Sequence, residues 1–199
     1  GSEPRVVAEQ AITLSDPASQ AAVLPSAVQH WCENDPPAAK AWASRLSGTP
    51  RMAAAAGILQ ASKPGTPEGM VAAQSMVKEM AHSQGTPPAS IEYAVSNFMH
   101  RWLRSDPEKA SAWADALPRG AMFDFAAAGI AEGLRVTDPR DALTWAASIG
   151  DPGRRNRWGS FILQDWSQAD SKDARAAVEA LNAPPEVKET FSKLIRTSP

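Results

Sequence analysis

The stretch "DPEKASAWADAL", from Asp106 to Leu117, contains the pattern that decides the fold. The same residue types recur at the same offsets after two other Asp-Pro pairs. Counted from the proline, Ala is third, Trp is sixth, Ala is seventh, and Leu or Ile is tenth. The three aligned stretches are 35–46, 106–117 and 138–149. We interpret this recurrence as a structural repeat.

Two weaker copies extend the pattern. Asp170 opens one of them, with Ala, Val and Leu at equivalent positions, and Thr66-Pro67 opens the other. The caps Asp106, Asp138 and Asp170 follow one another at intervals of 32 residues. A period near 32 is typical of stacked helical hairpins.

Each position of the repeat has a mechanical reason. Asp before a helix accepts hydrogen bonds from free N–H groups of the first turn, and Pro suits the first helical position because its missing N–H is not needed there. The positions three, six, seven and ten after Pro share one face of a helix, where Trp fills the space between neighbouring helices. The pattern predicts the first helices of five hairpins at 36–47, 67–83, 107–117, 139–149 and 171–182.

Pro or Gly follows these segments, and a second apolar helical pattern then leads to the next unit. The residue four positions before the next cap is Trp in three units, at Trp31, Trp102 and Trp166. We predict second helices at 51–62, 88–105, 120–136 and 153–168, with N-terminal helices at 6–14 and 26–33 and a closing helix at 186–197. Asp16-Pro17 also has the composition of a truncated unit.

The predicted fold class is therefore all-α, an αα-hairpin repeat solenoid (superhelix) with a period of about 32 residues. Residues 1–34 form an N-terminal cap, residues 35–182 form the helical-hairpin repeats, and residues 183–199 form a C-terminal capping helix. We expect the three regions to make one structural domain.

The stretch "DPEKASAWADAL" is similar to the junction between tetratricopeptide repeats, where Asp-Pro precedes a helix with Ala and then Trp. The resemblance covers these positions in three or four units. It departs from the family elsewhere: the usual Gly of the first helix and the Tyr after it are missing, Tyr93 is the only tyrosine, and the period is shorter than the family's value of about 34. The resemblance implies a right-handed solenoid that binds peptides or proteins on a concave face.

Composition argues against two classes of partner. The chain has 20 Lys and Arg against 22 Asp and Glu, so it lacks the basic stripe that nucleic-acid binding requires. Its longest apolar run, near 52–59, is too short to span a bilayer, so we expect no membrane insertion. The opening Gly1-Ser2 is typical of a cloning remnant, so we expect a longer natural N-terminus, and cytoplasmic and exported (periplasmic) locations both stay open.

Groups with catalytic or metal-binding potential are sparse. Cys32 is the single cysteine, which excludes an intrachain disulfide, and its apolar surroundings predict a small buried hydrophobe. The histidines His30, His82 and His100 are widely separated and form no zinc-binding motif. Helix capping accounts for most of the acidic residues. We expect no catalytic residue, no metal site and no cofactor.

The stretch "GDPGRR", from Gly150 to Arg155, is the most distinctive polar feature. Its Asp-Pro pair caps the following helix, which places Arg154, Arg155 and Arg157 near exposed N–H groups that suit a carboxylate or another anion. The alternative is a solvated basic turn that pairs with neighbouring acids. Trp158 lies outside the two periodic tryptophan positions and is a candidate surface anchor.

We predict a non-catalytic module that binds a protein or peptide partner or acts as a scaffold. The candidate contact residues are Arg154, Arg155, Arg157, Trp158, Arg101 and Arg104. Two alternatives stay open: an αα-fold enzyme acting on glycans, which needs two carboxylates that converge in a pocket, and a structural segment of a larger envelope protein. The sequence specifies neither the partner nor the oligomeric state.

Overall fold

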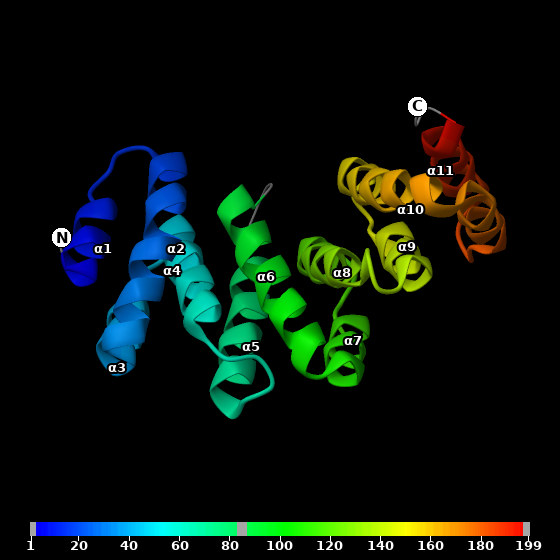
Figure 1. Ribbon diagram of the computed structural model, residues 1–199. Coiled ribbons are helices and arrows are strands. Elements are labelled where there is room, and N and C mark those ends of the chain that lie inside the picture. The colour runs from blue at the N-terminus through cyan, green and yellow to red at the C-terminus, as the bar shows by residue number, and fades with distance from the viewer. Residues whose placement is uncertain (1–2, 83–86, 197–199) are drawn as a thin grey trace. The chain divides into compact units, whose positions relative to one another are not determined.

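A computed structural model describes residues 3–82 and 87–196, and it is all-helical over these ranges, which confirms the predicted all-α class. Eleven helices and no strand occur among the described residues (Figure 1). In chain order they are α1 (Pro4–Ala11), α2 (Pro17–Asn34), α3 (Pro36–Ala43), α4 (Gly48–Ala61), α5 (Pro67–Ala81), α6 (Ala89–Ser105), α7 (Pro107–Asp115), α8 (Ala121–Leu134), α9 (Pro139–Ser148), α10 (Pro152–Ala180) and α11 (Pro185–Arg196).

The packing divides the chain into two compact units, Gly1–Trp102 and Leu103–Pro199. The division falls inside α6, so α1 to α5 belong to the first unit and α7 to α11 belong to the second. Each unit has its own cluster of buried hydrophobic residues.

Four aspartates that open the aligned stretches share one backbone conformation. Their φ and ψ angles are −144° and 79° at Asp35, −158° and 83° at Asp106, −146° and 77° at Asp138, and −151° and 89° at Asp170. Each side chain accepts a hydrogen bond of 2.9–3.1 Å from the backbone N–H three residues later. The predicted caps are therefore confirmed, and the non-helical Asp170 separates the two helical segments of α10.

The residues that follow these caps are buried as the pattern predicts. The alanine three positions after the proline, or after Ser171 in the fourth stretch, is fully buried in every case: Ala39, Ala110, Ala142 and Ala174. The tryptophans four positions before a cap are also buried, and those six positions after the proline are half-buried. Trp31 of α2 contacts Trp42 of α3, with ring centroids 5.4 Å apart. These indoles therefore fill space between helices.

The N-terminal region differs from the prediction. A single helix, α2, begins at Pro17 and continues through Pro25, where we predicted a new helix from residue 26. Proline removes one N–H from the helix and leaves the carbonyl four residues earlier without its usual donor. That carbonyl belongs to Ala21, and it accepts a 2.7 Å hydrogen bond from the hydroxyl of Ser90 on α6. A tertiary contact thus replaces the lost helical bond.

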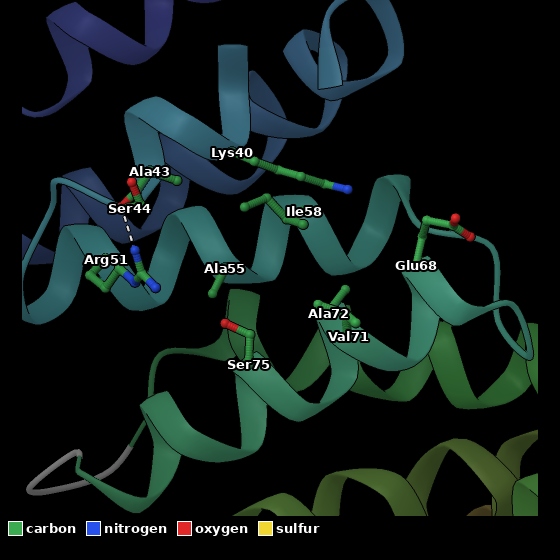
Figure 2. A pocket seen from close by; sticks show the side chains of 10 residues that line it. All are labelled: Lys40, Ala43, Ser44, Arg51, Ala55, Ile58, Glu68, Val71, Ala72 and Ser75. Atoms are coloured by element: carbon green, nitrogen blue, oxygen red, sulfur yellow. Dashed lines mark hydrogen bonds between the residues drawn. The ribbon is translucent and has the colours of Figure 1, made fainter. Parts of the chain in front are cut away.

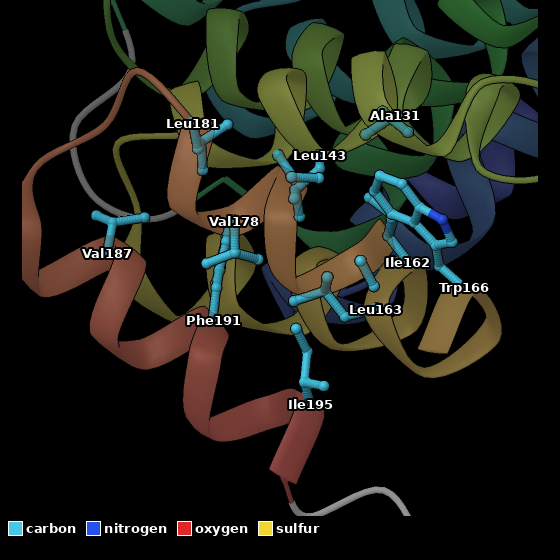
Figure 3. Packing of buried hydrophobic residues seen from close by; sticks show 14 residues of the cluster. Ala131, Leu143, Ile162, Leu163, Trp166, Val178, Leu181, Val187, Phe191 and Ile195 are labelled. Carbon is cyan, nitrogen blue, oxygen red and sulfur yellow. The ribbon is translucent and has the colours of Figure 1, made fainter. Parts of the chain in front are cut away.

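The second unit is closed by the amphipathic helix α11. Val187, Phe191 and Ile195 lie on its buried face and pack against Leu163 and Val178 of α10 (Figure 3). A side chain at Gly159 of α10 would collide with the ring of Phe191, so glycine at this position allows the two helices to approach closely.

Candidate binding groove

A groove in the first unit runs between α3, α4 and α5 and has a volume of about 190 Å³. Figure 2 shows that α4 lies between the other two helices and that side chains from all three point into the opening. The lining residues are Lys40, Ala43, Ser44, Arg51, Ala55, Ile58, Glu68, Val71, Ala72 and Ser75.

Small residues create this groove. Each of the three helices contributes one buried alanine to the lining of the groove: Ala43, Ala55 and Ala72. Because their side chains end at Cβ, the helices pack closely while the space above them stays open. Val71 stands at the edge of the groove with 66% of its surface exposed. The result is an apolar floor with an exposed aliphatic rim.

Arg51 ties the three helices together at one end of the groove. Its Nη1 donates a 2.8 Å hydrogen bond to the carbonyl of Ala43 at the end of α3. Its Nε lies 2.9 Å from Oε1 of Glu79 on α5, and both side chains are about one quarter exposed, at 27% and 24%. These two contacts fix the position of the Arg51 side chain. Because the charges of Arg51 and Glu79 compensate each other, this end of the groove is electrically neutral.

The other end carries two charges without a fixed partner. Lys40 extends from α3 over Ile58, toward the end where Glu68 lies in the first turn of α5 (Figure 2). Both residues are exposed. Within residues 3–82 and 87–196, neither side chain forms a hydrogen bond or an ion pair. A base and an acid therefore stand on opposite walls of an apolar groove.

The structure places Arg154, Arg155, Arg157 and Trp158 in the first two turns of α10, in the second unit. Arg154 is largely buried and stacks on Phe125 at 4.6 Å, and its Nη1 lies 3.6 Å from Asp151. Arg155 donates a 3.0 Å hydrogen bond to the carbonyl that follows α9. Arg157 is exposed, and Trp158 is half-buried against the core of this unit. Two of the three arginines thus contribute to the packing of the unit itself.

The backbone N–H groups of the "GDPGRR" turn bind carboxylates of the chain itself. The carboxylate of Asp124 on α8 accepts hydrogen bonds of 2.8 Å from the N–H of Gly150 and 2.9 Å from the N–H of Asp151. The side chain of Asp151 in turn accepts the N–H of Arg154 at 2.6 Å. Carboxylates of the chain itself therefore accept three of the N–H groups that we considered for an external anion.

Arg101 and Arg104 are one turn apart on α6. Arg101 donates a 3.0 Å hydrogen bond to the carbonyl of Gln60 near the end of α4, and burial lowers the pKa of its guanidinium. Arg104 is exposed. Arg101 belongs to the first unit, whereas Arg104 and the arginines of α10 belong to the second.

Reactive groups do not gather in the described part of the chain. Burial raises the pKa of the Cys32 thiol to about 11, so it stays protonated at neutral pH. Among residues 3–82 and 87–196, no three His, Cys, Asp or Glu side chains lie together as metal ligands would. None of the described helices has the length and hydrophobicity needed to cross a membrane.

Sequence analysis missed the groove and Asp124. No sequence pattern indicates the groove, because it depends on how three helices pack around small residues. A sequence pattern does indicate Asp124: it is a lone acid in the apolar stretch 121–131, where a buried charge requires fixed hydrogen-bond donors. Comparisons of this chain with protein-family models, curated proteins and solved structures find no match.

Proposed function

We propose that this chain is a non-catalytic module of helical repeats that binds a segment of a partner protein. The shared backbone geometry of Asp35, Asp106, Asp138 and Asp170 supports repeated hairpins with a period of about 32 residues, in a tetratricopeptide-like solenoid. Repeat modules of this kind bind partners through side chains that vary between units.

The groove between α3, α4 and α5 is the observation that carries the proposal. Its volume of about 190 Å³ is below the roughly 300–1,000 Å³ of sites that enclose small molecules or cofactors. A groove of this size suits one or two side chains of a larger partner. An anchor side chain of a partner would become buried between the apolar floor and the exposed Val71, and protein interfaces are organised around such buried anchors.

Selection of a displayed library of random dodecapeptides on the immobilised protein tests the proposal. We expect enriched peptides whose binding is lost in Val71→Glu, because this change places a charge at the apolar rim. Val136→Glu is the matched control, since Val136 is an 80% exposed valine in the second unit. Failure to enrich any peptide would contradict a binding function.

A further inference from the structure

Charged side chains at the two ends of the groove restrict its partner further than the apolar floor does. At one end, Arg51 and Glu79 satisfy each other across 2.9 Å, so this end offers no free charge to a partner. At the other end, the side chains of Lys40 and Glu68 lack a hydrogen bond or an ion pair within the described ranges. The charges available to a partner are therefore confined to one end, with the two signs on different helices.

This arrangement restricts what the groove accepts. An aliphatic side chain on the floor places the residues that flank it near the two walls. The wall formed by α3 carries the cation of Lys40, and the wall formed by α5 carries the anion of Glu68. A partner with like charges in these places is repelled, and complementary charge fixes the orientation and register of a bound segment.

We propose that the groove recognises a protein segment in which an aliphatic anchor residue is flanked by an acid on one side and a base on the other. The acid of the partner meets Lys40, the aliphatic side chain contacts Ile58 and Ala72, and the base meets Glu68. This inference rests on the proposed function and specifies its partner. For segments whose other residues set one backbone direction in the groove, the charge pattern selects one order of the two flanking residues, whereas the floor alone would accept both.

A charge-swapped variant tests the order directly. Peptides are selected on the wild-type protein and, separately, on the double variant Lys40→Glu with Glu68→Lys, which keeps the net charge. We expect both selections to yield an aliphatic residue between opposite charges, with the order reversed on the variant. Lys172→Glu with Glu179→Lys is the control, because it swaps two exposed charges of α10 in the second unit.

Affinities then provide a quantitative check by fluorescence anisotropy. We expect a wild-type-selected peptide to bind the swapped variant about tenfold more weakly, since two exposed ion pairs become repulsive. A peptide in which the two flanking charges are exchanged should bind the swapped variant with about the affinity that the original peptide has for the wild type. The loss of affinity and its recovery should both become smaller at about 1 M NaCl, where the screening length falls to roughly 3 Å.

Three results would overturn the inference, and they separate it from the proposed function. Peptides that depend on Val71 but show no charge order would leave the groove as a binding site and exclude the charge rule. Peptides that bind independently of Val71 would leave a binding module whose site lies elsewhere. No enrichment at all would contradict the binding function together with the inference.

Discussion

The hydroxyl of Ser90 on α6 donates a 2.7 Å hydrogen bond to the carbonyl of Ala21 on α2, across 69 residues of sequence. This carbonyl is the one that Pro25 leaves without a helical donor. The contact explains how α2 continues through a proline, and it joins α2 to the part of α6 that belongs to the first unit.

Ser90→Ala should therefore lower the free energy of unfolding by about 1–2 kcal/mol, because a half-buried carbonyl loses its donor. In a Pro25→Ala background, the restored N–H can serve the carbonyl, and the cost of Ser90→Ala should fall close to zero. Urea denaturation of the four proteins gives this double-mutant cycle. Ser47→Ala is the control, since its side chain makes no capping bond. Equal costs in both backgrounds would exclude the proposed compensation.

Asp124 organises the junction between α8, α9 and α10. Asp124→Ala leaves the N–H groups of Gly150 and Asp151 without their acceptor and should destabilise the protein by about 1–3 kcal/mol. Asp165→Asn removes an exposed carboxylate that lies 3.4 Å from Arg135 and should change stability by less than about 1 kcal/mol. Urea denaturation compares the two variants, and a similar effect of both would show that Asp124 has no special structural role.

Gly159 and Gly153 both lie near the start of α10, but substitution by alanine should change the stability of the protein differently at the two positions. Gly159→Ala would push the new methyl group into Phe191 and should cost about 1–3 kcal/mol. Gly153→Ala meets only Oδ1 of Asp151, at 3.4 Å, and should be neutral or stabilise by up to ~1 kcal/mol. Thermal unfolding measures both. A Phe191→Leu change should recover part of the Gly159→Ala loss, and absence of recovery would contradict the proposed collision.

Acid should weaken the cap of α7. Hydrogen bonds from the Lys109 side chain and backbone hold the pKa of Asp106 below its ordinary value of 3.8. The ionised form is favoured in the folded state, so this stabilisation is present above about pH 4 and is lost as pH falls through the lowered pKa. The stability difference between wild type and Asp106→Ser should therefore shrink from pH 5 to pH 2 in urea denaturation. A constant difference over this range would exclude the carboxylate as its source.

The parts of the fold that depend on local sequence could be predicted. The helix starts at Pro36, Pro107 and Pro139 follow from the capping aspartates, because the cap bonds span only three residues. The course of α2 through Pro25 could not be predicted, since its compensation comes from Ser90 in a distant helix.

The candidate site was less accessible to sequence analysis for a similar reason. Arginines are conspicuous in the sequence, but Arg155 and Arg101 donate to carbonyls of their own unit. The groove is formed by alanines, which reveal nothing about a surface until the helices are packed. The prediction that a partner contacts Arg154, Arg155, Arg157, Trp158, Arg101 and Arg104 is still to be tested by alanine substitution.

The most direct test of a binding groove is the mapping of amide chemical shifts in the ¹⁵N-labelled protein during titration with a selected dodecapeptide. We expect the largest changes at residues of α3, α4 and α5 that line the groove, such as Ser44, Ala55 and Ala72, and their loss in Val71→Glu. Changes centred on Arg157 and Trp158, with the groove unaffected, would contradict the account and favour the basic turn of α10.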